Sequence, residues 1–286
     1  MSRSDCGSRA LGHRRSSRAP IARTPRRGLT LIELLIVLVI LAVMATVAVR
    51  SLQPMADQAR YDRTARTMNE LSSAIGIGPM TRQADGQAIV HGFVADMGRL
   101  PIPQGTAPET QLAELWLPST FTHRIQSGPT TPSDYSNVSL PCGWRGPYLQ
   151  LGIGENDLRD GWGEALVPTV VADRITQLDW TVRAPFVAND ALTVDLTEAL
   201  VTVTIGVQQN GSPPPSTAIR MLWPDPESTT LRVASPDASP PPGTWATFSN
   251  VPIGLRAIHV TVGTETVIRY VTILPGNNAP IVIDLP

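Results

Sequence analysis

A single carboxylate stands inside a long apolar stretch near the start of this 286-residue chain. Between Gly28 and Arg50 run 21 residues, and Glu33 carries the only charge among them. A carboxylate at the centre of a membrane-spanning helix costs about 2.5–3.5 kcal/mol on insertion scales, and less near a helix end. The position of Glu33 therefore calls for a specific role.

A second set of acids has the spacing of a possible metal loop. Glu155, Asp157 and Asp160 are close enough in sequence for one loop to gather their oxygens, and carboxylate oxygens are the ligands that Ca²⁺ takes. The alternative is a surface loop in which the three acids are simply solvated. Apart from this calcium candidate, the sequence predicts no metal and no cofactor.

The other reactive side chains form no recognisable catalytic motif. The sequence has no H-E-x-x-H, C-x-x-C or G-x-S-x-G pattern and no phosphate-binding glycine loop. A lone thiol such as Cys142 is most often buried. The histidines are far apart in the sequence, at His13, His91, His123 and His259. We therefore expect that the protein is not an enzyme; the alternative, a membrane-anchored periplasmic enzyme, has no motif that predicts a substrate.

The apolar stretch has the length of a membrane-spanning helix. Leu29 to Val49 would form a helix about 31 Å long, close to the thickness of a bilayer's hydrocarbon core. Residues 1–28 carry a net charge of +7 and the rest of the chain −8, so the positive-inside rule places the leader in the cytoplasm. The mature part shows no basic face for nucleic acid, and the span directly after the leader argues against a DNA-binding arm.

Two simpler interpretations fit the apolar span less well. A secretory signal has a shorter apolar core of about 7–15 residues with no internal charge, followed by a small-residue cleavage site such as Thr46-Val47-Ala48. A plain single-span anchor explains the length and the basic flank. It leaves Glu33 without a role.

The segment R-R-G-L-T-L-I-E-L-L-I-V-L-V-I-L, which begins at Arg26, closely resembles the class III signal of type IV prepilins and type II secretion pseudopilins. The resemblance implies that a membrane prepilin peptidase cuts after Gly28 and that the new N-terminal residue, Leu29, is N-methylated. It also implies that Glu33 meets the free N-terminal amine of a neighbouring subunit during filament assembly. The family usually has Phe where this chain has Leu29, a mild departure that leaves the processing prediction intact.

The helical pattern continues beyond the span. We predict one helix from about residue 30 to about residue 75, bent at Pro54 and ended by Gly76 and Pro79. Its distal half should pack against the globular part of the same chain. The apolar positions that recur at three- or four-residue spacing are Leu52, Met55, Ala59, Met68, Leu71 and Ile75.

Later stretches resemble the globular head of the same family. D-M-G-R-L-P at 96–101 resembles the turn after the long helix, while G-P-Y-L at 146–149 and D-G-W-G at 160–163 resemble the pair that frames a small antiparallel sheet. We interpret them as turns with aromatic core packing, because Tyr148 and Trp162 have large apolar bodies with polar tips. The Asp-rich Ca²⁺ loop of the major secretion pseudopilin is missing after D-G-W-G, which counts against a major subunit.

From about residue 191 the sequence becomes all-β in character. W-A-T-F-S-N-V-P-I-G-L-R-A-I-H-V at 245–260 resembles the last strands of transthyretin-like, carboxypeptidase-regulatory-like modules, which are mostly adhesive or spacing elements. Runs rich in β-branched residues alternate with turn signals, which indicates a β-sandwich; the runs lie at 199–207, 219–223, 255–262, 266–274 and 280–285.

These features predict an α+β fold. A long N-terminal transmembrane helix leads into a small pilin-like antiparallel β head, and an all-β sandwich follows. The expected boundaries are a cleaved cytoplasmic leader at 1–28, a transmembrane and amphipathic helix at 29–75, the head at 76–190 and the transthyretin- or Ig-like sandwich at 191–286.

The function expected from this organisation is that of a prepilin-like subunit of a periplasmic filament, most like a minor or tip pseudopilin of type II secretion. The alternatives are a type IV pilus minor pilin or adhesin and a membrane-anchored periplasmic binding protein. We expect a single-pass protein of the bacterial inner membrane, with a cytoplasmic N-terminus and periplasmic C-terminal domains. The expected partners are the prepilin peptidase and methylase, other pseudopilins or pilins, the inner-membrane assembly platform and membrane lipid, without nucleic acid.

Overall fold

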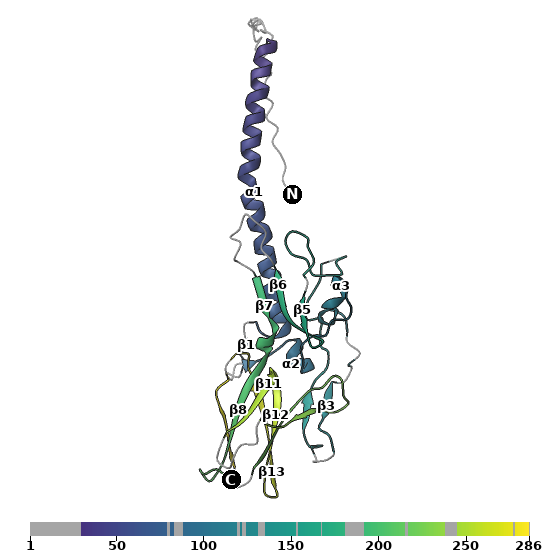
Figure 1. Ribbon diagram of the computed structural model, residues 1–286, viewed down its shortest axis with the longest axis vertical. Helices are drawn as coiled ribbons and strands as arrows, with labels where there is room; N and C mark the ends of the chain where they lie inside the picture. The colour runs from purple at the N-terminus through teal and green to yellow at the C-terminus, as the bar shows by residue number, and fades with distance from the viewer. Residues whose placement is uncertain are drawn as a thin grey trace, which may run out of the picture. The chain divides into compact units, whose positions relative to one another are not determined.

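The computed structural model describes most of the chain after the leader (Figure 1). Gly28 and Leu29, the predicted processing site, lie outside the described residues. The chain divides into two compact units, Met1–Gln53 and Pro54–Pro286. The described residues are 30–78, 81–82, 88–118, 121, 124–130, 135–152, 154–166, 168–180, 192–214, 217–237, 245–276 and 278–285.

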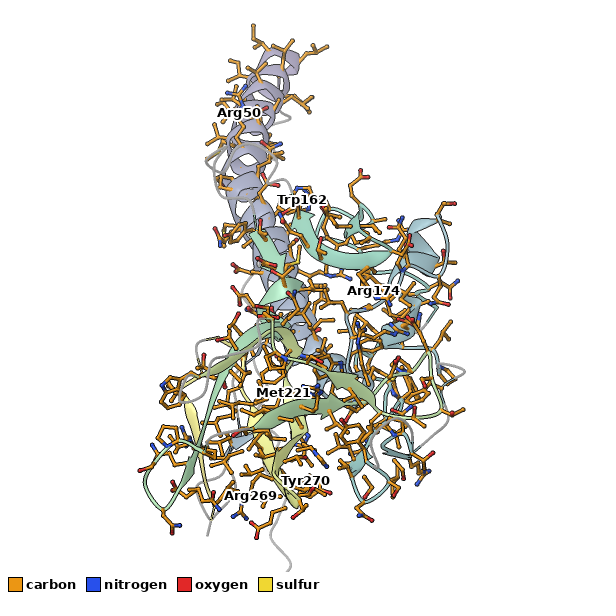
Figure 2. All side chains as sticks on the ribbon, turned by 60° about the horizontal axis from the view of Figure 1, so that its bottom comes forward. Arg50, Trp162, Arg174, Met221, Arg269 and Tyr270 are labelled. Atoms are coloured by element: carbon orange, nitrogen blue, oxygen red, sulfur yellow. The ribbon has the colours of Figure 1, made fainter. Side chains whose placement is uncertain are left out.

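The described part of the first unit belongs to one long helix. α1 covers Leu31–Ile75, which confirms the helix predicted for about 30–75, and it continues through Pro54. Every side chain from Leu31 to Gln53 is exposed and most are aliphatic; Figure 2 shows them around the helix, with Arg50 labelled. Among the described residues, α1 is the one helix long and apolar enough to cross a membrane. Exposed apolar side chains of this kind are stable in hydrocarbon and costly in water.

The second unit begins with the distal part of α1, which is buried on one face. Met68, Leu71 and Ile75 lie at helical spacing and are almost fully covered, as the apolar pattern predicts. Leu52 and Met55 continue the same pattern toward the N-terminus, but they are exposed. The packed face is therefore confined to the distal part of the helix.

Short elements separated by long connections follow α1 up to residue 180, in a region that Gly and Pro residues interrupt. The elements are β1 (Thr81–Arg82), β2 (Ala88–Ile89), α2 (Phe93–Met97), α3 (Pro108–Gln111), η1 (Ala113–Leu115), β3 (Ile125–Ser127), β4 (Ser139–Pro141), β5 (Pro168–Val171) and β6 (Arg174–Trp180). β1–β2, β3–β4 and β5–β6 are antiparallel pairs.

The C-terminal region is built from strands. They are β7 (Leu192–Asp195), β8 (Leu200–Gln209), β9 (Ala218–Trp223), β10 (Arg232–Ala234), β11 (Ala246–Pro252), β12 (Gly254–Val262), β13 (Glu265–Ile273) and β14 (Ile281–Leu285), with the short helix η2 (Leu196–Ala199) between β7 and β8. β10, β9, β12 and β13 form an antiparallel four-stranded sheet. β11, β8 and β14 form a second sheet, in which β14 runs parallel to β8.

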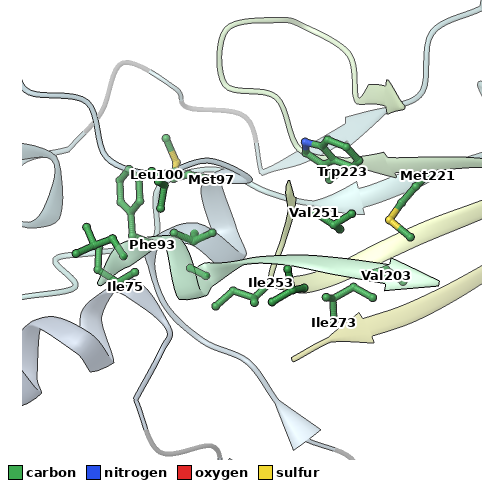
Figure 3. Packing of buried hydrophobic residues seen from close by; sticks show 14 of the residues in the cluster. Ile75, Phe93, Met97, Leu100, Val203, Met221, Trp223, Val251, Ile253 and Ile273 are labelled. Carbon is green, nitrogen blue, oxygen red and sulfur yellow. The ribbon is translucent and has the colours of Figure 1, made fainter. Parts of the chain in front are cut away.

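One cluster of buried side chains joins both sheets to the region before residue 190. Val203 of β8 and Met221 of β9 belong to the same cluster as Ile75 and Phe93, and Figure 3 shows these four residues in one close-up. β6 also pairs with β7, so a sheet runs across the boundary expected at residue 190. Because the two regions share a core, their folding as separate domains stays a prediction.

Candidate functional site

Glu33 lies in the first turn of α1, where the helix itself contributes to its placement. α1 begins at Leu31, so Thr30 occupies the N-cap position and Glu33 the third helical position. The backbone N–H of Glu33 donates a hydrogen bond to Thr30 Oγ1 at 3.3 Å. T-x-x-E is the sequence pattern of a capping box, of which the structure shows the half made by the Thr30 side chain, and a carboxylate is favoured at the positive end of the helix dipole. Our sequence reasoning missed this cap, although T-L-I-E was its signal.

The side chain of Glu33 remains exposed in this arrangement. A carboxylate near the helix end is therefore stabilised by the local backbone field and is also accessible to a cation from another molecule. The uncharged run from Leu34 to Val49 follows it directly. This geometry suits an ion pair at the end of a membrane helix.

The G-R-L-P turn places an ion pair in the interior of the second unit. Gly98 caps the C-terminal end of α2 with a left-handed φ of 69°, and a Cβ there would lie 2.1 Å from the carbonyl oxygen of Pro224. The guanidinium of Arg99 donates to both carboxylate oxygens of Glu114, at 2.9 and 2.8 Å. The same carboxylate accepts the backbone N–H of Ile102 at 2.8 Å. The pair therefore fixes the turn against η1.

Asp96 and Tyr148 connect this turn to the G-P-Y-L motif. The Tyr148 hydroxyl donates to Asp96 Oδ2 at 3.0 Å, and the rings of Phe93 and Trp144 each meet the Tyr148 ring edge to face. Trp144 Nε1 donates to the carbonyl oxygen of Glu114 at 2.9 Å. Burial raises the pKa of Asp96 and the pKa of Tyr148, so the hydroxyl stays a donor at neutral pH. The predicted role of these motifs, a turn with aromatic packing, is confirmed.

The D-G-W-G motif packs tightly against the distal part of α1. The backbone N–H of Gly161 donates to Thr64 Oγ1 at 2.8 Å. A Cβ at Gly161 would lie 2.0 Å from the carbonyl oxygen of Arg60, so only glycine fits. Asp160 Oδ1 accepts the backbone N–H groups of Trp162 and Glu164, at 2.9 and 2.7 Å, which closes the loop. Trp162 is labelled in Figure 2.

The three acids of the calcium candidate have separate partners. Asp160 closes the D-G-W-G loop, and Asp157 forms an ion pair with Arg159 at 2.9 Å. Glu155 accepts the backbone N–H of Gly152 and lies 3.6 Å from Arg63. In the part of the chain that the structure describes, no group of three or more His, Cys, Asp or Glu residues is arranged to hold a metal ion. The acids therefore serve local turns and ion pairs here.

Arg256 is a buried cation that the sequence reasoning missed. Its side chain is fully covered, and burial lowers its pKa to about 9. Its donors satisfy backbone carbonyls in two regions: those of Val94 and Ala95 in α2, and those of Pro252, Ile253 and Leu255 where β11 ends and β12 begins. The carbonyl end of a helix favours a cation, so Arg256 ties the four-stranded sheet to the helix of the G-R-L-P turn. An arginine inside the apolar run I-G-L-R-A-I was the available signal.

Cys142 and the described histidines are dispersed. Cys142 is buried, as expected, and burial raises the pKa of its thiol to about 11, which disfavours the reactive thiolate. His259 is buried against the ring of Tyr135, with centroids 4.7 Å apart, whereas His91 is exposed. His13 and His123 lie outside the described residues. These groups do not converge on one position.

Comparison with known proteins identifies one matching segment. Residues 23–49 match the family model of the prokaryotic N-terminal methylation motif. The matched segment contains the predicted processing site, Glu33 and the apolar run of α1. No curated protein and no solved structure matches the chain.

Proposed function

We propose that the protein is a prepilin-like subunit that assembles with other pilin-like subunits into a filament through its N-terminal helix. The proposal rests on one observation, the match of residues 23–49 to the N-terminal methylation motif, in a segment that continues as an exposed apolar helix. Membrane anchoring follows from the same helix. In this role the chain is a structural component, and the processing chemistry is performed on it by a prepilin peptidase.

The assembly step in this proposal is electrostatic. Cleavage after Gly28 would leave a cationic amine on Leu29, at the end of an apolar helix. An unpaired charge in a low-dielectric filament core costs several kcal/mol, and the carboxylate of Glu33 on a neighbouring subunit would remove that cost. The pair would set the axial register of two helices, while van der Waals packing along the run to Val49 would hold them together.

The finer form of the proposal is a minor or tip pseudopilin of type II secretion, held in the bacterial inner membrane with its second unit in the periplasm. The basic leader supports this orientation by the positive-inside rule. The contacts around Arg99, Tyr148 and Gly161 support a pseudopilin-like head, because each motif of the resemblance has a defined structural role. The additional pair of C-terminal sheets is bulky, which suits a rare or terminal position.

A type IV pilus minor pilin, or a membrane-anchored periplasmic binding protein, is the second candidate. An exposed aromatic residue next to the C-terminal sheets favours a binding role, because Trp245 is about half exposed. Deletion of the gene separates the two candidates. Loss of protein secretion with normal pili supports the pseudopilin, whereas loss of adhesion with normal secretion supports the minor pilin.

The general proposal is tested by cross-linking in cells. A cysteine placed at Leu38, in the exposed apolar run, should give disulfide-linked products with cysteines at equivalent positions of other pilin-like subunits. The matched control carries the cysteine at Thr202, an exposed residue on β8 of the C-terminal sheets. Cross-links from Leu38 alone support assembly through the helix, and their absence under conditions that permit filament formation would contradict it.

A further inference from the structure

Trp245 is an exposed aromatic residue that lies directly on a glycine. It precedes β11, and the antiparallel register that pairs Ala246 with Ile205 places it opposite Gly206 of β8. A Cβ at Gly206 would lie 2.6 Å from Cζ3 of the indole, so a larger residue would displace the ring. Gly206 is buried, whereas Trp245 keeps 46% of its surface exposed. Part of the indole therefore covers the strand and the remainder faces solvent.

The indole lies on the outer face of the three-stranded sheet. Val203 and Ile205 of β8 are buried in the core, and residues alternate along a strand, so the ring over Gly206 is on the opposite side. On the other side of Gly206 the register places Val282 of β14, which is also 46% exposed. Trp245, Gly206 and Val282 thus form a row across the sheet, in which the indole covers the glycine and lies beside the valine.

Polar side chains flank this row on the same face. Thr204 and Gln208 lie two residues before and after Gly206 on β8, and the register places Asp284 of β14 beside Gln208. Same-face neighbours on adjacent strands are about 5–8 Å apart at Cβ. A hydroxyl, an amide and a carboxylate therefore surround a small apolar platform.

We propose that this row and its polar neighbours bind a pyranose ring of a β-1,4-linked glycan. The face of an aromatic ring is electron-rich, so it attracts the slightly positive C–H groups on the flat face of a sugar. Equatorial β-1,4 linkages leave that face unobstructed and direct the hydroxyl groups to the edge of the ring. There, Gln208 supplies both a donor and an acceptor, and Asp284 supplies an acceptor.

The size of the platform favours a sugar over a protein partner. Among the described residues, the exposed apolar part of this row is one indole and one valine, an area that matches a single pyranose ring. A stable protein interface buries about 800 Å² on each partner around several apolar anchors. The short polar side chains around Trp245 suit hydroxyl groups better than an apolar surface. This binding site is separate from the N-terminal helix and does not depend on the filament role.

The test uses the full-length protein in detergent micelles and cellohexaose as the probe. Ligand-observed saturation-transfer NMR should detect binding with a dissociation constant of roughly 1 mM, as expected for one stacking platform. Trp245→Ala should weaken binding about tenfold or more. Tyr270→Ala is the matched control, because Tyr270 is 50% exposed on β13 of the other sheet, and it should leave binding unchanged.

Because Trp245 covers Gly206, its removal also affects the local packing. Gln208→Ala and Asp284→Ala provide a second test at surface positions, and each should weaken cellohexaose binding roughly threefold to tenfold without changing the unfolding midpoint. Absence of binding by the wild-type protein would overturn the proposal, as would unchanged binding in these two variants. Equal binding of maltohexaose, whose α-linked chain coils, would overturn the stated linkage.

Discussion

The backbone N–H of Glu33 donates to the hydroxyl of Thr30 at 3.3 Å, so the helix cap and the carboxylate of Glu33 are separable features of one turn. The cap needs the side chain of Thr30 and only the backbone of Glu33. The exposed carboxylate of Glu33 remains available to a second subunit. Substitutions at the two positions therefore have different consequences.

Glu33→Ala should be processed normally but should assemble at least tenfold less well with wild-type partners. The physical reason is that an amine left without its carboxylate in the filament core costs about 3–5 kcal/mol. Thr30→Ala removes only the cap, at about 0.5–2 kcal/mol of local helix stability, and should leave assembly nearly unchanged. Quantifying cross-linked subunits for both variants provides the measurement. Equal effects of the two substitutions would mean that the turn matters only as a cap.

Glu114→Ala should lower the free energy of unfolding by about 3–5 kcal/mol, because it leaves the guanidinium of Arg99 buried without its partner. The side chains of this pair are only 13% and 7% exposed. Glu227→Ala is the control: its partner is Arg174, the pair is exposed, and we expect a loss of at most about 1 kcal/mol. Urea unfolding of the full chain in detergent measures the free energy of unfolding of both variants. Similar losses in the two variants would show that burial does not decide the strength of the Arg99 contact.

Asp96→Asn should remove a specific part of the pH dependence of stability. Burial raises the pKa of Asp96 above its ordinary 3.8, so the folded chain binds this proton more tightly than the unfolded chain does. The contribution of Asp96 to stability is therefore highest below 3.8 and falls as the pH rises through the elevated pKa. The unfolding free energy of the wild-type protein minus that of Asp96→Asn should decrease as the pH rises from 3.8 through the elevated pKa of Asp96. Two contacts act in the opposite direction, the hydrogen bond from Tyr148 and the ion pair with Arg145 at 3.8 Å. A difference that rises with pH would mean that these contacts outweigh burial.

Gly161→Ala should destabilise the second unit by about 2–4 kcal/mol, because its Cβ would collide with the carbonyl oxygen of Arg60 and break the hydrogen bond to Thr64. Gly163→Ala, in the same motif, is the matched control. Gly163 has a φ of 87° but open space around its Cβ position, so the expected cost is only the backbone strain of about 1–2 kcal/mol. Thermal unfolding midpoints compare the two variants, and equal shifts would show that the close approach of the loop to α1 is unimportant.

Local sequence patterns predicted much of the secondary structure. The helix was predicted to end at Gly76, and α1 ends at Ile75, because a φ of 108° at Gly76 requires a residue without a Cβ. The runs of β-branched residues from 199 to 285 coincide with β8, β9, β12, β13 and β14 to within two residues. In both cases the deciding interactions are between neighbours in the sequence.

Local sequence patterns did not predict the long-range contacts. Arg256 donates to the carbonyls of Ala95 and Val94, which lie 161 and 162 positions earlier in the sequence. Strand β14 pairs parallel to β8 across a long connection. The acids Glu155, Asp157 and Asp160 satisfy a spacing rule for Ca²⁺, and each also has a backbone or arginine partner, so calcium binding there stays a prediction. The spacing of acids in the sequence does not show which hydrogen-bond donor contacts each carboxylate. The common core of the second unit likewise depends on contacts that no local pattern reveals.

The most direct test of the filament-subunit proposal is the N-terminus of the protein extracted from membranes. Mass spectrometry should find a mature chain that begins at Leu29 and carries one N-methyl group, in agreement with the methylation motif at 23–49. Replacement of Gly28 by a bulky residue should leave the full-length chain on denaturing gels. An intact Met1 in the wild-type protein, or a chain that begins beyond Val49, would contradict the account.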